Sequence, residues 1–188
     1  MKKYNQLWIR QMLFVCCAVL VGTLSFPALT HAADTYKYTS EKYGYTIECP
    51  QKPVGVIPLS AVSSEENGDV LIFDNDAYNI KKAWIISVDA FKDADVPDLD
   101  KISDADRDLL FKKLLSNGYE YAKLVPIDGK NALYTATAGT DKQIKTYIRG
   151  TNNRYAAVLV EHPDLTKKSI DAYQKGLISF REVTNGTK

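Results

Sequence analysis

The sequence predicts an α+β domain in which an antiparallel β-sheet of about six to seven strands packs with two main helices as an α-β-α sandwich. Runs of β-branched and aromatic residues, separated by turn residues, recur along the chain and are typical of strands. Two other segments place apolar residues at helical spacing. At 188 residues, 45% of them hydrophobic, the chain is long enough to bury one continuous core.

The first residues are predicted to be a secretory signal peptide rather than part of this domain. Three basic residues precede an apolar run over 12–24, and small residues follow at 30–33. This order is that of a cleaved signal, and we expect cleavage near Ala32 or Ala33. The alternative is an uncleaved anchor, for which the apolar run is short.

The domain organisation follows from this signal. We expect a signal peptide over 1–32, a single exported domain over 33–188, a secreted or periplasmic location and no permanent membrane anchor after cleavage. Cleavage removes three of the 24 basic residues and none of the 23 acidic ones, which leaves 21 against 23 and a net charge of −2. Without a cationic excess we expect no nucleic acid as partner, and instead an envelope protein or a small ligand.

The first half of the domain is predicted to consist of strands. Residues 36–38 and 43–49 alternate between aromatic or apolar and polar side chains, the period of a half-buried strand. A short strand is expected at 54–57. The nearly continuous apolar runs at 70–73 and 83–88 are typical of strands that are buried on both faces, at the centre of the sheet.

The first helix is predicted to begin after Ser103, whose hydroxyl suits a cap. Its leucines at 109, 110, 114 and 115 recur at helical spacing, and Asn117-Gly118 is a typical helix end. A strand over 119–127 follows. Three further strands, with turn residues between them, are expected to form an antiparallel meander from Asn131 to Glu161.

The last helix is predicted to begin at Pro163-Asp164. Its apolar stripe consists of Leu165, Ile170, Tyr173, Leu177 and Phe180. The tail at 181–188 carries no core pattern, so we expect it to fray.

The opening Tyr43-Gly44-Tyr45-Thr46-Ile47-Glu48-Cys49-Pro50, the order of the elements and the closing Leu177-Ile178-Ser179-Phe180 resemble the PsbP-like family. The resemblance covers most of the domain in the order of its elements. It implies an antiparallel sheet between helices, in small exported proteins that mostly act as accessory or binding subunits. It implies no catalytic residue.

Reactive side chains are scarce in the expected domain, which retains one cysteine and one histidine. Nucleophilic catalysis needs a nucleophile with a base in reach. Cys49 shares its strand face with Tyr45 and Ile47, so we expect a small buried core residue. His162 is expected to be a solvated turn residue. We assign no catalytic residue and expect no cofactor.

Aspartates crowd the connection between the central strands and the first helix. Asp93, Asp95, Asp98 and Asp100 are candidate ligands for calcium, which binds clustered carboxylates outside the cell. The spacing lacks the glycine and the distal glutamate of a calcium loop. In the alternative interpretation the acids near the first helix complement its dipole, and the others are solvated loop charges.

A second candidate site is a cationic and aromatic face of the meander. Lys145, Tyr147 and Arg149 alternate along its middle strand and so project together, with Arg154 just past the next turn. Such a face suits an anionic or sugar-like ligand. The alternative is the ordinary solvated face of an antiparallel sheet.

These observations favour an exported, non-enzymatic binding or accessory domain. The alternative function is a carboxylate-dependent hydrolase acting outside the cytoplasm, with Asp74 and Asp76 as acid and base. A raised pKa of one of them in a cavity would support the hydrolase. Two aspartates this close are otherwise ordinary turn residues.

Overall fold

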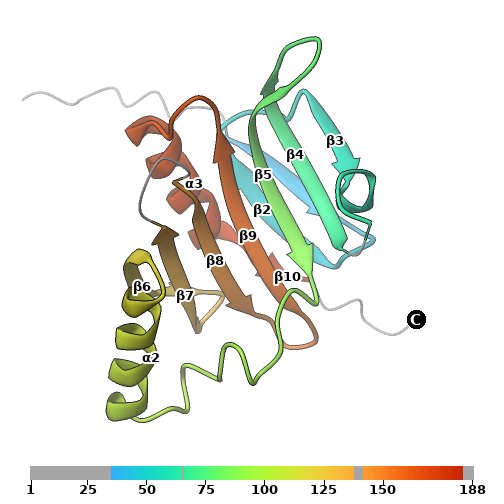
Figure 1. Ribbon diagram of the computed structural model, residues 1–188. Coiled ribbons are helices and arrows are strands. Elements are labelled where there is room, and N and C mark those ends of the chain that lie inside the picture. The colour runs from blue at the N-terminus through green and yellow to red at the C-terminus, as the bar shows by residue number, and fades with distance from the viewer. Residues whose placement is uncertain (1–34, 65, 138–141, 184–188) are drawn as a thin grey trace, which may run out of the picture. The chain divides into compact units, whose positions relative to one another are not determined.

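The computed structural model describes residues 35–64, 66–137 and 142–183 (Figure 1). The predicted signal peptide and residues 139–141, the turn residues between the first two strands of the predicted meander, lie outside the described residues. The strands are β1 (Tyr36–Ser40), β2 (Tyr45–Cys49), β3 (Gly55–Pro58), β4 (Asn67–Asn75), β5 (Ile80–Val88), β6 (Tyr119–Ile127), β7 (Lys130–Thr137), β8 (Ile144–Arg149), β9 (Arg154–Glu161) and β10 (Arg181–Glu182). The helices are the 3-10 helix η1 (Leu59–Ala61) and the α-helices α2 (Asp104–Ser116) and α3 (Lys167–Ser179).

A sheet of seven strands forms the middle layer, in the order β3-β4-β5-β9-β8-β7-β6. All neighbouring strands in it are antiparallel. The predicted meander is confirmed, because β7, β8 and β9 are neighbours in this order. β5 lies beside the central β9, as its apolar run predicted, whereas β4 lies one place further out.

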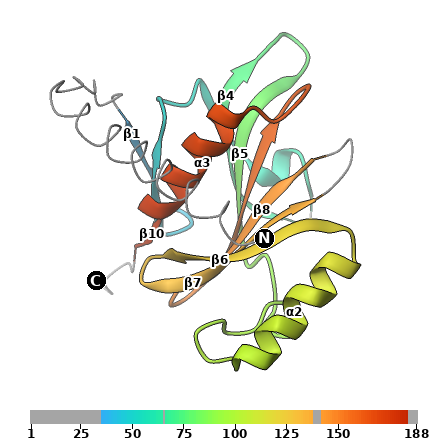
Figure 2. The same ribbon diagram turned by 90° about the vertical axis from the view of Figure 1, so that its left-hand side faces the viewer.

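The opening strands form a second sheet that the sequence did not predict. β2 pairs with β1 on one side and with β10, from the far end of the chain, on the other. This small sheet and α3 lie on the same side of the large sheet, as Figure 2 shows, and share one core with it. A buried hydrogen bond of 2.7 Å from Tyr45 Oη to Asp69 Oδ2 also joins the two sheets.

The shared core is built around Trp84 on β5. Its ring meets those of Phe73 and Tyr173 edge to face, at centroid distances of 5.0 and 5.7 Å. On α3, Gly176 presses against the same indole, and a Cβ at that position would lie 2.5 Å from the Trp84 ring. Of the predicted stripe, Tyr173, Leu177 and Phe180 are buried in this core and Ile170 packs against it, whereas Leu165 lies before the helix begins.

The opposite face of the large sheet is covered by α2 and by the connection at 89–103. Ser103 caps α2 as predicted, since its hydroxyl oxygen accepts the amide of Asp106 at 3.1 Å. Of the predicted leucines, Leu110 and Leu114 pack towards the sheet, whereas Leu109 and Leu115 are exposed. Neither α2 nor α3, the α-helices of the described residues, combines the length and the apolar character that a bilayer crossing needs.

The last helix begins at Lys167, later than the predicted start at Pro163-Asp164. Thr166 is its cap and accepts the Ser169 amide through Oγ1 at 3.3 Å, while the Glu161 carboxylate accepts the Thr166 amide at 2.7 Å. Pro163 and Asp164 therefore belong to the connection that precedes the helix. The threonine hydroxyl and the glutamate satisfy amides that the helix itself leaves free.

The prediction that the tail frays from residue 181 is wrong at its start. Arg181 and Glu182 form β10 and pair with Thr46 and Tyr45. The following amide, of Val183, donates to Gly44 O at 2.8 Å. The tail pattern missed this because a strand of two residues has no periodicity to detect.

Gly176→Ala is expected to destabilise the fold. The added Cβ would meet the Trp84 ring at 2.5 Å and the Glu48 carbonyl at 2.8 Å. We expect the free energy of unfolding in urea to fall by about 1–3 kcal/mol, the usual effect of overpacking, despite the better helix propensity of alanine. Lys175→Ala, at the exposed neighbouring position, should change it by less than about 0.5 kcal/mol. Equal stability of the two variants would contradict the close contact.

Candidate functional site

The predicted cationic and aromatic face is present but covered. Lys145, Tyr147 and Arg149 alternate on β8 with the buried Ile144, Thr146 and Ile148, so they share one face of the strand as predicted. The Tyr147 ring packs edge to face on Phe91 at 5.6 Å, and the Lys145 ammonium lies 5.0 Å from the centre of the Tyr147 ring. The connection at 89–103 therefore lies over the face on which we expected a ligand.

Asp93, from the predicted calcium site, binds two arginines of the predicted cationic face. One of its oxygens accepts Arg149 Nη1 at 2.7 Å and Arg154 Nε at 3.3 Å. Arg149 also donates to the Val96 carbonyl at 2.9 Å, and only 10% of its side chain is exposed. The hydrogen bond from Arg149, followed by that from Arg154, lowers the pKa of Asp93. The interpretation as an ordinary solvated face therefore does not describe Arg149.

The other predicted calcium ligands each have a protein partner of their own. Asp95 accepts the Lys92 amide at 3.2 Å, and Asp98 lies 3.0 Å from the Lys101 ammonium. Asp100 accepts the side-chain amide of Asn131 at 2.7 Å. Within the described ranges, no three side chains of the metal-binding kinds are grouped so that they would hold an ion. Thermal unfolding with and without calcium, described below, tests the calcium site that the sequence suggested at these four aspartates.

The single cysteine and histidine of the domain lie where the sequence placed them. Cys49 is buried in the core, and burial raises the pKa of its thiol to about 12. At neutral pH the thiol is therefore protonated and a poor nucleophile. His162 is exposed.

Of the two proposed hydrolase residues, Asp76 lies in the turn between β4 and β5, and Asp74 lies near the end of β4. Asp76 accepts the amides of Tyr78 and Asn79 at 2.9 and 2.8 Å, and these hydrogen bonds lower its pKa. Asp74 is exposed at the end of β4. A lowered pKa is the reverse of what a general acid needs, so the structure does not favour the hydrolase.

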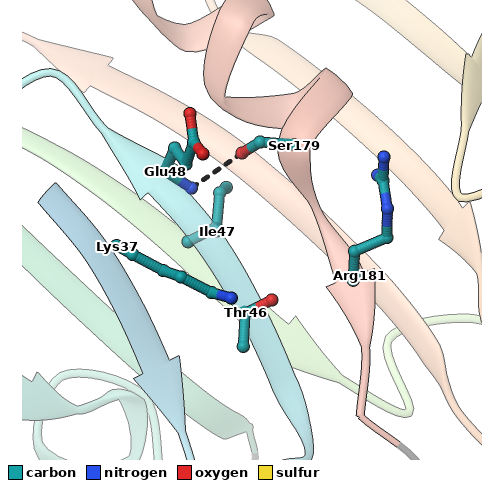
Figure 3. A pocket seen from close by; sticks show the side chains of 6 residues that line it. All are labelled: Lys37, Thr46, Ile47, Glu48, Ser179 and Arg181. Atoms are coloured by element: carbon teal, nitrogen blue, oxygen red, sulfur yellow. Dashed lines mark hydrogen bonds between the residues drawn. The ribbon is translucent and has the colours of Figure 1, made fainter. Parts of the chain in front are cut away.

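A hollow of about 240 Å³ opens on the small sheet (Figure 3). Its lining consists of Lys37, Thr46, Ile47, Glu48, Ser179 and Arg181. Figure 3 shows Lys37 on β1 and Arg181 on β10 to either side of β2. Two cations, one carboxylate and two hydroxyls in one hollow suit a polar ligand with an anionic group. We call this the small-sheet hollow.

The hollow lies where the pairing between β2 and β10 stops. β10 pairs only with Thr46 and Tyr45. Further along β2, the amide of Glu48 donates to Ser179 Oγ at 2.7 Å instead of to a strand. Arg181 is held by its own hydrogen bond to Ile178 O at 2.8 Å and lies 3.5 Å from Asp128. The guanidinium thus has a fixed place on one side of the hollow, while Lys37 is exposed on the other.

The sequence did not identify the hollow. Lys37 and Glu48 meet because β1 and β2 pair in that register, and Arg181 arrives from the end of the chain. Alternation along residues 36–38 and 43–49 was the only available signal, and it gave strands without their partners.

Comparison with known proteins supports the fold. No family model and no curated protein matches the chain. The solution structure of cyanobacterial PsbP (CyanoP) from Synechocystis sp. PCC 6803 aligns with 86% of this chain and 99% of that chain, with a TM-score of 0.51 and 13% sequence identity. The chain has the PsbP-like fold. This confirms the fold that the opening and closing motifs indicated, and at 13% identity it transfers no functional residue.

Asp93→Asn should lower the melting temperature at neutral pH, because Arg149 and Arg154 lose their shared carboxylate. The pKa of Asp93 is lowered in the folded state, so its contribution to stability is present above its ordinary value of 3.8 and is lost as the pH falls through the folded-state pKa. The difference between wild type and variant should therefore shrink below about pH 4. Asp108→Asn, exposed on α2, is the control. A difference independent of pH would contradict the ion pair.

Millimolar calcium and chelators should leave the melting temperature unchanged, because each of the four aspartates already has its own contact within the protein. Thermal unfolding with and without calcium measures this. A calcium-dependent rise of several degrees, absent in Asp93→Asn, would instead establish a calcium site on the connection.

Proposed function

We propose that the protein is exported and acts as a non-enzymatic accessory domain that binds an envelope protein at the small-sheet hollow. The single observation that carries this proposal is the placing of Lys37 and Arg181 to either side of β2, around one polar hollow. The predicted signal peptide supports export. The role that the PsbP-like resemblance implies, an accessory or binding subunit, agrees with it.

The size of the hollow favours a protein partner over a small ligand. Pockets that enclose small molecules usually measure about 300–1,000 Å³ and cover most of the ligand. At about 240 Å³ this hollow is smaller and holds one side chain or a short stretch of backbone. An acidic side chain of a partner fits its two cations, whereas Glu48 disfavours a ligand with several negative charges.

The side chains that remain for catalysis support a binding role. The thiol of Cys49 is buried and protonated, and Asp76 is held as an anion by two backbone amides. Tyr155 also supports a binding role, since burial raises its pKa to about 12 and leaves its hydroxyl neutral. None of these groups is poised near neutral pH for proton transfer.

The meander face stays a second candidate for the same partner. Of its four side chains, Arg149 and Arg154 are bound to Asp93 and the Tyr147 ring packs on Phe91, so Lys145 is the one that the connection at 89–103 does not hold. A ligand that used all four side chains would first have to displace the connection at 89–103.

The proposal predicts that capture of a partner depends on Lys37. The mature protein, immobilised and exposed to an extract of its own cell envelope, should retain a specific protein, and Lys37→Gln should weaken that retention by about threefold or more, as for an ion pair at an interface. Lys175→Gln makes the same charge change on the exposed side of α3 and should have no effect. Lys145→Gln tests the meander face in parallel.

Two outcomes would contradict the proposal. One is that nothing is retained from the envelope. The other is that retention falls equally in the Lys37 and Lys175 variants, since the effect would then report net charge rather than the hollow. Loss of retention in Lys145→Gln alone would assign binding to the meander face instead.

A further inference from the structure

The turn between β8 and β9 encloses the carboxylate of Glu182. Three consecutive backbone amides point at it: Thr151 N donates to Oε2, Asn152 N lies 3.1 Å from Oε2, and Asn153 N lies 3.0 Å from Oε1. The Asn153 side-chain amide and Tyr155 Oη also lie within 3.3 and 3.2 Å of Oε1. Successive amides arranged in this way form a concave anion site.

The site is built rather than incidental. Tyr155 is fully buried, and its ring is fixed edge to face against Phe180 at 5.1 Å. Gly150 leaves the space for the carboxylate, because a Cβ there would lie 2.8 Å from both of its oxygens. The backbone of the turn closes on itself through Gly150 N, which donates to Asn153 O at 2.9 Å. All the donors therefore belong to the β8–β9 turn and its flanks.

The carboxylate comes from a different part of the fold. Glu182 stands on β10, which is two residues long and belongs to the small sheet. Its amide donates to Asp128 Oδ2 at 3.2 Å, and its neighbour Arg181 lies 3.5 Å from the same side chain. The amides of the β8–β9 turn and the carboxylate that they bind thus belong to separate segments. The strand that carries the carboxylate makes few backbone hydrogen bonds.

We propose that residues 150–155 form a carboxylate-binding site in its own right, of which Glu182 is an exchangeable occupant. Its ligand class is a carboxylate, supplied either as a small free acid or as an acidic side chain on an extended segment of a partner that replaces β10 beside β2. Both ligands present the same group as the bound Glu182, a carboxylate with one negative charge. This site shares no residue with the small-sheet hollow, so its test is independent of the proposed function.

Chemical rescue tests the proposal. In the mature protein with Glu182→Ala, 100 mM sodium acetate should raise the melting temperature by about 2–4 °C relative to sodium chloride of equal ionic strength, because acetate binds the folded state alone. The wild type, whose site is filled, should show no such difference. Amide NMR signals of Thr151, Asn152 and Asn153 should move with acetate in the variant and stay in place in the wild type.

Two peptides identify the source of the ligand. Acetyl-Arg-Glu-Val-amide, which has the sequence of residues 181–183, should move the same amide signals, whereas acetyl-Arg-Gln-Val-amide should not. Saturation at a lower concentration than acetate supports an extended segment of a partner, because the peptide then also pairs with β2 in place of the variant's own residues 181–183. Saturation at the same or a higher concentration supports a small free acid.

Acetate that stabilises Glu182→Ala no more than chloride, and moves none of the three amides, overturns the proposal. Adding Gly150→Ala to that variant is the internal control, since its Cβ fills the place of the carboxylate and should abolish the response. If Glu182→Ala does not fold, Glu182→Gln keeps the volume of the side chain. Acetate should then move the same amides by competing with a neutral ligand, and its failure to do so is equally decisive.

Discussion

The fold depends on how closely α3 approaches Trp84. At Gly176 the indole of Trp84 and the carbonyl of Glu48 on β2 leave no room for a Cβ, which would lie 2.5 Å from the indole and 2.8 Å from the carbonyl. One helix position therefore touches both sheets. The indole N–H of Trp84 is buried without a hydrogen-bond partner in the described part of the chain, at a cost of about 1–3 kcal/mol. The same ring joins α3 to the large sheet through its contacts with Tyr173 and Gly176.

The contact between Gly176 and Trp84 also positions the small-sheet hollow and the carboxylate site of the β8–β9 turn. Because α3 is fixed at Gly176, Ser179 reaches the Glu48 amide three residues further on, at 2.7 Å. Phe180 then enters the core, where it stacks on Tyr45 at 5.5 Å. The chain leaves the core as β10, which delivers Arg181 to the hollow and Glu182 to the β8–β9 turn. The end of α3 thus determines where Arg181 and Glu182 lie.

Local patterns predicted the elements well and their long-range pairing poorly. The meander and the Ser103 cap follow from neighbouring residues, and the structure confirms them. The small sheet was not predicted, because β10 pairs with a strand more than a hundred residues earlier and is too short for periodicity to appear. The late start of α3 was not predicted either, because both a proline and a threonine are typical of a helix start. The sequence does not show that Thr166, with Glu161 accepting its amide, is the residue that caps the helix.

For the sites, the alternation on β8 gave the correct face, but the covering connection at 89–103 lies far from it in the chain. The salt bridge between Arg149 and Asp93 was invisible for that reason, and each partner was therefore assigned a ligand of its own.

The shortness of β10 decides how its two side chains behave. A strand with two paired residues contributes little by its backbone hydrogen bonds alone, each worth about 1 kcal/mol net. Its position is instead held at both ends, by the buried ring of Phe180 before it and by the amides that bind the Glu182 carboxylate after it. Arg181 lies between these two anchors, and its guanidinium is also held by the carbonyl of Ile178 and by Asp128. If the carboxylate leaves the β8–β9 turn, Phe180 still fixes the start of the strand and these contacts still hold Arg181, while the core stays intact. Exchange of the Glu182 carboxylate for a small acid would therefore leave the hollow and the domain in place, and the two sites can act separately.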